Sequence, residues 1–376
     1  MFNLIFVIVG LLNLIIFAFS SGNFYDEAIF SLAARMVLLL NVIFVTATVI
    51  KNRVSRKFAI NLGILLCMLV CSYMSYILNP NGGMFDFIIT VLGYLAVPIY
   101  MLAIPDTEFN LKTKKWLQLM GIAYVVLFIY CGFVEPIYRN EFSTALSMGY
   151  SNPNRTGCYL LLAVIYLLVA FENNKKMKIV SYALSVILLY LIMLTECRTA
   201  FILGLIALIY AIIPKLKAGK IFALICTFSP LIFMFVYSYA YKNGWFYGAE
   251  IFGKDFFSGR EEMHTDIMSN ISMLGNYGDV KFGGLNVSMS VLSTIGVVGF
   301  LLFYVYYTRF MTDRFIQIES RNKNKNLGLV CMGLLMFHGC TETALFTGGT
   351  VYAGMVGCIL ALINMNNHER KVKGNL

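Results

Sequence analysis

The chain has 376 residues, of which 59% are hydrophobic and only 13% are charged, and its mean hydropathy is +0.77. A soluble domain of ordinary composition is about 45–50% apolar, so this composition excludes a water-soluble globular protein and predicts an all-α integral membrane protein. The formal net charge of +10 would suit a nucleic-acid ligand. The Lys and Arg residues are instead distributed as expected for a membrane protein whose basic loops face the cytoplasm, and no nucleic-acid partner is expected.

Apolar runs of membrane-spanning length recur along the whole chain. A spanning helix needs about 20 mostly apolar residues. Twelve transmembrane helices are predicted on this basis, at residues 2–20, 28–50, 58–78, 84–104, 116–134, 153–171, 179–196, 198–213, 221–241, 287–308, 327–345 and 348–365. The eighth is short, and little more than Thr347-Gly348-Gly349 separates the last two. Residues 1–376 are therefore expected to form a single polytopic membrane domain.

Basic residues are concentrated in alternate loops, which predicts the orientation of the chain. One set of loops holds 21 of the 29 Lys and Arg residues, at positions 51–57, 112–115, 175–178, 215–220, 309–325 and 370–373. By the positive-inside rule these loops and both termini are cytoplasmic. The first apolar run has no Lys or Arg before it and no small-residue cleavage site, so it is expected to be a retained span.

The predicted outer side has two substantial loops, 135–152 and 242–286, and the second is a large extracytoplasmic loop between spans nine and ten. The sequence contains no GxxxxGK[ST] loop, which argues against an ATP-driven pump encoded by this chain. Eight of the nine cysteines lie in apolar runs, and the cysteines form no CxxC pair or metal-ligand pattern. They are expected to be structural thiols, and no metal or cofactor is predicted.

Two arginines occupy predicted helix starts at the outer ends of spans. Asn152 is a good N-cap residue and Pro153 suits the first helical position, so Arg155 falls in the first turn of span six. Arg198 begins span eight directly after the tight junction that closes span seven. The backbone N–H groups and the positive dipole end of a helix start, together with a guanidinium, make a site for an anion.

A third arginine repeats this setting inside the large outer loop. Ser258 and Glu261 have the spacing of a capping box, which predicts a short amphipathic helix with Arg260 in its first turn. Each of the three arginines has an alternative interpretation as an interfacial residue that extends its charge into water. Their recurrence at one outer level favours a shared anionic ligand.

Four short motifs occur in one order along the chain: Asn152-Pro153-Asn154-Arg155, Cys197-Arg198-Thr199-Ala200, Ser258-Gly259-Arg260, and Leu285-Asn286 leading into 291–299. The chain resembles the O-antigen and capsular polysaccharide polymerases (Wzy-type) in these motifs, in their order and in their predicted placement at the outer ends of spans. These belong to a larger superfamily that includes the O-antigen ligases. The resemblance covers roughly residues 58–345.

The resemblance implies a metal-independent glycosyltransferase at the outer face of the bacterial cytoplasmic membrane. In that family a growing glycan leaves its polyprenyl diphosphate and joins the sugar of an incoming lipid-linked oligosaccharide repeat unit. Arg155, Arg198 and Arg260 would hold the diphosphate. Further substrate contacts would come from the polar motif residues Asn152, Asn154, Ser258 and Asn286. The expected partners are membrane lipid, the lipid-linked oligosaccharide, a chain-length regulator and a flippase.

The sequence leaves the identity of the general base undecided, because many relatives carry His-Asn where this chain has Leu285-Asn286. Glu196 is the first candidate, with a plain ion pair to the neighbouring arginine as the alternative. His264 and Asp266 lie on the predicted loop helix, where solvated side chains are the rule. His338 and Glu342 are spaced i, i+4 in span eleven and are expected to share one helix face, either as a structural pair or as part of the site.

Two other functions fit part of the pattern. An O-antigen ligase-type transferase would pass the glycan to a lipid A core or to a protein, but the missing histidine disfavours it. A lipid-linked oligosaccharide flippase would also have twelve spans with both ends inside. Transporters carry charged residues deep in their spans and have short outer loops, whereas the charges here lie at outer helix ends and one outer loop is long.

Overall fold

The structure is a computed structural model of the whole chain. It describes residues 2–20, 56–78, 84–104, 107, 109–138, 144–150, 152–213, 220–251, 254–255, 261–275, 286–319, 327–343 and 349–374, and scattered positions between 32 and 47. Nearly all of this part of the chain is helical. A single pair of short antiparallel strands, β1 (Glu250–Ile251) and β2 (Lys254–Asp255), lies in the outer loop.

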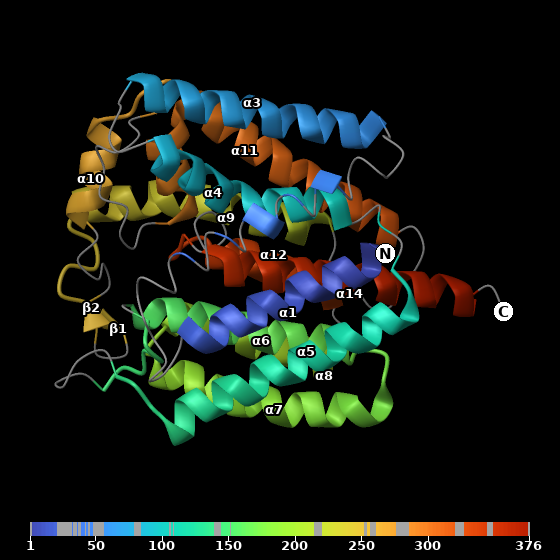
Figure 1. Cartoon of the computed structure of the whole chain (residues 1–376). Coiled ribbons are helices and arrows are strands. Elements are labelled where there is room, and N and C mark those ends of the chain that lie inside the picture. Colours follow the sequence, from blue (N-terminus) through green and yellow to red (C-terminus); the bar gives the residue numbers. More distant parts are fainter. Residues whose placement is uncertain are drawn as a thin grey trace.

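The long helices run roughly parallel to one axis, and the short helix α10 lies across one end of them, as Figure 1 shows. In chain order they are α1 (Phe2–Ser20), α3 (Arg56–Leu78), α4 (Met84–Ala103), α5 (Leu111–Ile129) with a π-helical turn (Tyr130–Val134), α6 (Pro153–Ala170), α7 (Lys175–Leu194), α8 (Arg198–Ile212), α9 (Lys220–Lys242), α10 (Glu261–Ser269), α11 (Val287–Glu319), α12 (Leu327–His338) and α14 (Gly349–Gly374). Figure 1 places both chain ends at the same end of the bundle.

Six stretches in the described residues are long and apolar enough to cross a membrane: Arg56–Leu78, Leu111–Val134, Pro153–Ala170, Lys175–Leu194, Leu224–Lys242 and Val287–Asp313. Four shorter apolar helices accompany them: Phe6–Ile16, Arg198–Ile212, Leu327–His338 and Val351–Asn366. The predicted helical, multi-span membrane class is therefore confirmed. The count of twelve spans and the cytoplasmic location of both termini stay predictions.

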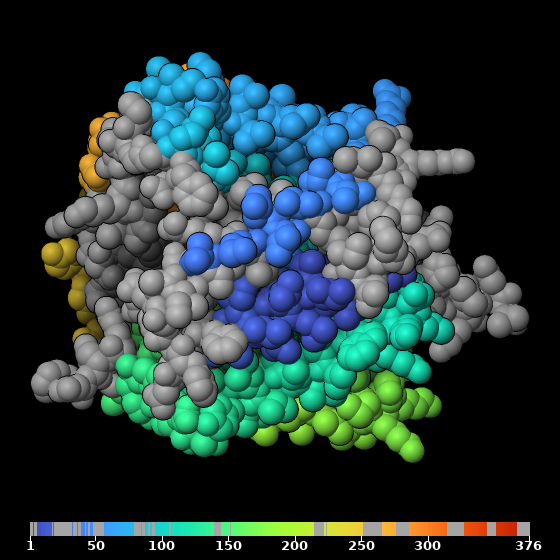
Figure 2. Space-filling model, in the orientation of Figure 1, coloured from blue at the N-terminus to red at the C-terminus, as the bar shows by residue number. Residues whose placement is uncertain are grey.

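Helix α6 is the centre of the bundle. Of its apolar window, 89% is buried inside the protein, against 33% for α3 and for α7, whose other faces carry exposed Ile, Leu and Val side chains. Protein surrounds this helix, because α5, α7, α8 and α14 all pack against it. In the face drawn in Figure 2, the surface is formed by α1, α3 and α5, whereas the side chains of α12 are almost all buried.

Asparagines of α14 join the ends of two neighbouring helices. The Asn366 amide donates to the carbonyl oxygen of Val169 at 2.9 Å, near the end of α6. The Asn364 amide donates to the carbonyl oxygens of Thr107 at 3.0 Å and Ile104 at 3.3 Å, just after α4. The last carbonyl groups of a helix have no partner within it. These side chains therefore satisfy them and fix α14 in register with α4 and α6.

The predicted tenth span, 287–308, is not one straight helix, because the chain reverses at Gly296. Gly296 has φ +68° inside α11, and the hydroxyl of Ser288 is hydrogen-bonded to that of Tyr304. A straight helix would separate these residues, 16 positions apart, by about 24 Å. Residues 287–295 therefore form a half-helix that folds back along residues 297–319.

The outer loop stabilises this reversal. The amides of Val297 and Val298, which lose their acceptors within the helix at the break, donate to the carbonyl oxygens of Ser272 at 3.1 Å and Met273 at 3.2 Å. The predicted span 287–308 runs through Gly296 without a break, because its apolar residues give no local sign of one. Only the loop carbonyls, distant in sequence, make the break favourable.

Candidate functional site

The start of α6, at the predicted outer end of the bundle, has the predicted capping geometry. Asn152 lies in extended conformation, and its Oδ1 accepts a hydrogen bond from the backbone N–H of Asn154 at 2.9 Å. Pro153 is the first helical residue. Arg155 follows in the first turn, with its N–H donating to the Asn152 carbonyl oxygen at 3.0 Å and its side chain exposed. The N-cap at Asn152 and the position of Arg155 are thus confirmed.

The start of α8 is reached through a strained turn. Glu196 has φ +58°, in the left-handed region that residues other than glycine seldom adopt. Such a conformation costs on the order of 1–3 kcal/mol and persists only where the surroundings enforce it. Here the N–H of Cys197 donates to the Thr195 hydroxyl at 3.3 Å, and the N–H of Arg198 donates to the Glu196 carbonyl oxygen at 3.1 Å. The turn makes Arg198 the first residue of α8, as predicted.

The two helix starts touch. A Cβ atom added at Gly157 would overlap the Cβ of Cys197 and would lie 3.0 Å from the Cys197 Sγ and from the Thr195 Oγ1. Only glycine permits this approach. Gly157 is two residues after Arg155 and Cys197 is one residue before Arg198, so the contact brings the backbones of both arginines together at the predicted outer end of the bundle.

The contact between the starts of α6 and α8 is here called the arginine junction. Residues 144–150, from the first predicted outer loop, pack against it and hydrogen-bond to it. The N–H of Leu146 donates to the Leu194 carbonyl oxygen at 2.9 Å, at the end of α7. The Thr156 hydroxyl donates to the Ser147 carbonyl oxygen at 2.5 Å, in the first turn of α6. The Thr144 hydroxyl donates to the Glu196 carboxylate at 3.2 Å. Sequence reasoning missed this segment, because its pairing partners are distant in sequence.

His338 and Glu342 lie on the inner side of the same junction, but not as predicted. Helix α12 ends at His338, and a turn follows before Glu342. Glu342 therefore lies outside the helix, although its N–H still donates to the His338 carbonyl oxygen at 3.2 Å, the bond that joins residues four apart in an α-helix. Both side chains are buried. The predicted span 327–345 is wrong in its end: residues 339–341 form a turn, and the Gly339 carbonyl oxygen accepts a hydrogen bond from the N–H of Val287.

Cys158, one turn into α6, links this turn to the arginines. Its Sγ lies 3.7 Å from Nε2 and 3.9 Å from Nδ1 of the His338 ring. The thiol is also within electrostatic range of Glu342 and Arg155. The histidine and the carboxylate thus belong to the neighbourhood of the α6 start, and Cys158 is a contact that the sequence did not single out.

Asn286 caps the half-helix of α11 beside the same turn. Its Oδ1 accepts from the N–H of Met289 at 2.8 Å, and the N–H of Val287 donates to the Gly339 carbonyl oxygen at 2.9 Å. The Asn286 side chain is buried, at 2% exposure. Contacts therefore run without a gap from the start of α8 through α6 and the end of α12 to Asn286, and they gather most of the predicted site residues.

The remaining predicted site residues lie in the large outer loop. The predicted loop helix is present as α10, which begins at Glu261. Asp266 is exposed on it, as expected. Ser258, Arg260 and the side chain of His264 lie outside the described residues. The proposed capping box and the position of Arg260 therefore stay predictions.

In the part of the chain that the structure describes, no group of three or more His, Cys, Asp or Glu side chains is placed to hold a metal ion. No family model, curated protein or solved structure matches this chain. Chemically, the outer junction offers two guanidinium groups at two adjoining helix starts, one carboxylate held by Thr144, and a buried imidazole below them. Such a set suits the binding of an anionic group and a proton transfer next to it.

Proposed function

We propose that the chain is a polysaccharide polymerase of the Wzy type. It would transfer a growing glycan from polyprenyl diphosphate onto an incoming lipid-linked oligosaccharide repeat unit at the outer face of the bacterial cytoplasmic membrane. The observation that carries the proposal is the contact between Gly157 and Cys197, because it joins two helix starts that each present an arginine. The twelve spans, with both termini in the cytoplasm, belong to this proposal.

In the proposed reaction an acceptor hydroxyl attacks the anomeric carbon of the donor sugar. The bond between that carbon and the phosphate oxygen breaks, the polyprenyl diphosphate leaves with the electron pair, and the hydroxyl proton passes to a base. Negative charge grows on the leaving diphosphate. Arg155, Arg198 and Arg260 are proposed to stabilise it, and the loss of one preorganised donor typically costs about 2.7–4 kcal/mol.

Glu196 is the proposed base. Glu196 is two residues before Arg198 in sequence, and its carboxylate accepts a hydrogen bond from the Thr144 hydroxyl. Its backbone has the strained φ of +58° in the turn that leads into α8. A general base contributes roughly 10²–10⁴-fold, so the arginines supply the larger share. Asn152, Asn154, Ser258, Asn286, His338 and Glu342 are proposed as substrate contacts around them.

Alanine substitution of each arginine tests the proposal. Arg155→Ala, Arg198→Ala and Arg260→Ala should leave protein in the membrane and reduce polymer by about 10²–10³-fold, as for other lost oxyanion donors. The corresponding Lys variants should recover part of the activity, because Lys keeps the charge and loses the bidentate fork. Chain-length distributions of the surface glycan at matched expression give the readout.

Lys242→Ala is the matched control. Lys242 is an exposed cation at the predicted outer end of a helix, but at the C-terminal end, without free N–H donors. Its variant should make normal polymer. An equal loss would mean that positive charge on this side is needed in general, and it would rule out specific binding of the diphosphate by the three arginines. In the inactive variants a single repeat unit should stay on the acceptor. Absence of all surface glycan would indicate a ligase, and repeats retained on the inner face would indicate a flippase.

A further inference from the structure

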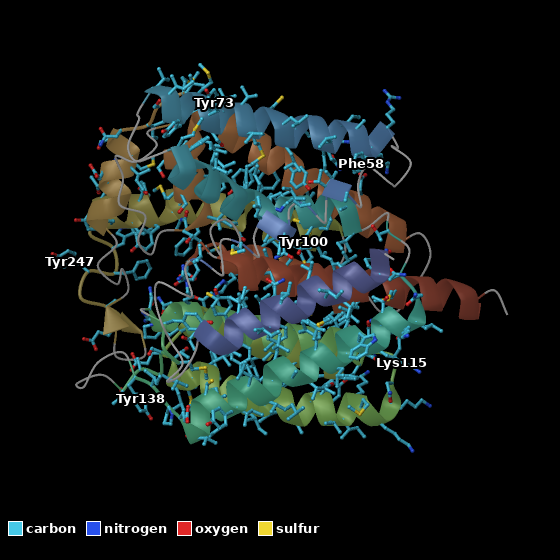
Figure 3. All side chains as sticks on the ribbon, viewed as in Figure 1. Phe58, Tyr73, Tyr100, Lys115, Tyr138 and Tyr247 are labelled. Atoms are coloured by element: carbon cyan, nitrogen blue, oxygen red, sulfur yellow. The ribbon has the colours of Figure 1, made fainter. Side chains whose placement is uncertain are left out.

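Three consecutive aromatic residues are exposed where α9 ends. Trp245, Phe246 and Tyr247, here called the aromatic turn, are 52%, 50% and 82% exposed. Figure 3 labels Tyr247 at the edge of the molecule that lies opposite Lys115. Leaving apolar surface in water costs about 25 cal/mol per Å². Three adjacent exposed rings therefore call for an apolar or interfacial partner.

The backbone holds the first ring in place. Gly244 has φ +67°, the N–H of Trp245 donates to the Ala240 carbonyl oxygen at 2.8 Å, and the N–H of Gly244 donates to the Tyr241 carbonyl oxygen at 3.0 Å. These two bonds form a Schellman motif, which ends a helix with a left-handed glycine. The apolar contact that usually accompanies the motif is also present, because the rings of Trp245 and Tyr239 pack edge to face with centroids 5.3 Å apart.

The second ring is presented at a conformational cost. Phe246 has φ +60°, which is unfavourable for a bulky residue. The N–H of Ala249 donates to its carbonyl oxygen at 3.0 Å and closes the turn. The turn is thus a built structure that keeps its rings outward.

The aromatic turn continues the exposed apolar face of α9. That face consists of Ile225, Ile232, Phe235, Val236 and Tyr239, each more than half exposed. In a membrane-spanning helix such a face contacts lipid. The stretch Leu224–Lys242 has 19 residues, or about 28 Å of helix, which matches the hydrocarbon thickness of about 30 Å. Trp245, folded back onto Tyr239, therefore falls at the boundary between hydrocarbon and headgroups.

We propose that Trp245, Phe246 and Tyr247 bind the outer headgroup region of the phospholipid bilayer and fix the depth at which the following loop leaves the membrane. Trp and Tyr rings prefer this zone because one part is apolar and the other can hydrogen-bond. This inference does not depend on the proposed polymerase activity, since any protein with this chain would present the same surface.

The test uses native fluorescence, because the chain has only two Trp residues. Trp116→Phe leaves Trp245 as the single probe in proteoliposomes of phosphatidylcholine and phosphatidylglycerol. Lipids brominated close to the headgroup should quench Trp245 more than lipids brominated near the chain end, and acrylamide in the water should quench it weakly. Tyr247→Trp in a chain with both native Trp residues replaced by Phe should give the same order.

Thr265→Trp in that background is the reference for a water-facing probe, because Thr265 is exposed on α10. The proposal is wrong if Trp245 is quenched by acrylamide as strongly as this reference and shows no quenching by brominated lipid. A shift of Trp245 emission on adding a soluble oligosaccharide to the protein in detergent, together with absent lipid quenching, would instead assign the aromatic turn to a glycan.

Discussion

At the scale of single residues, the candidate site depends on the absence of one side chain. Gly157 lies against Cys197 and Thr195 so closely that no Cβ fits, and the two arginine-bearing helix starts adjoin only for that reason. Gly63 in α3 is a useful contrast, because a Cβ added there meets nothing within 4 Å. Both glycines lie inside helices, so their intrinsic helix propensities are alike and only the packing differs.

We expect Gly157→Ala to destabilise the protein by about 1–3 kcal/mol, the usual cost of overpacking, and to reduce polymer formation by separating Arg155 from Arg198. Gly63→Ala should be neutral or stabilising by up to about 1 kcal/mol, since Ala favours helix over Gly. Thermal unfolding in detergent and the glycan chain-length distribution measure the two effects. Equal stability of the two variants would show that the junction tolerates a methyl group.

At the scale of elements, the reversal of α11 at Gly296 is the feature with the largest consequence. The reversal places the Asn286 cap beside His338 and Gly339, whereas a straight helix would carry Asn286 away from them. Two conditions support it: the left-handed backbone at Gly296, and the carbonyl oxygens of Ser272 and Met273, which accept the freed amides. A Cβ at Gly296 would lie 2.5 Å from the Met273 carbonyl oxygen.

Crosslinking tests the reversal directly. In a chain freed of its natural cysteines, Ser288→Cys and Tyr304→Cys should be joined by a short bismaleimide, because these side chains are in contact. Ser288→Cys with Val305→Cys is the matched control, since Val305 is exposed on another face of the helix. Equal yields from the two pairs would contradict the fold-back.

Adding Gly296→Ala to the first pair should lower its yield, because alanine is strained at φ +68° and collides with the loop. Gly248→Ala is the control for replacing a glycine of positive φ elsewhere in the chain, since Gly248 has φ +71° in the turn after α9 and open space around it. That variant should keep the crosslink. If Gly296→Ala also keeps it, the close approach of the loop does not maintain the break.

At the scale of the whole molecule, both chain ends lie at one end of the bundle, and the arginine junction lies at the other (Figure 1). The positive-inside rule assigns the first end to the cytoplasm. Cys197 lies at the outer junction but is 4% exposed, so it is a poor reporter of topology. Exposed positions on loops are needed in its place.

Labelling of introduced cysteines should establish the orientation. A membrane-impermeant maleimide applied to intact spheroplasts should label Glu250→Cys, which is exposed on the outer hairpin, and should leave Asn174→Cys, exposed between α6 and α7, unlabelled until the cells are opened. The natural cysteines give a low background, because all except Cys67 are buried. The reverse pattern would place the arginine junction in the cytoplasm and would exclude the proposed reaction there.

The sequence by itself determined the features that depend on a few neighbouring residues. Hydropathy gave the helical membrane class, and Asn152-Pro153 gave the start of α6, because capping is decided within one turn. The short helix α10 followed from its local apolar spacing. From sequence alone the proximity of Arg155 and Arg198 is only a hypothesis, suggested by their similar helix-start surroundings.

The tertiary structure decided everything that depends on contacts between distant segments. Gly157 meets Cys197 because α6 and α8 pack against each other, and no local pattern marks that glycine as different from Gly63. The end of α12 at His338 and the reversal of α11 at Gly296 occur where chain segments far apart in sequence supply hydrogen-bond partners. A helix breaks inside a membrane protein only where other groups satisfy the freed backbone, and that condition is a property of the assembled bundle.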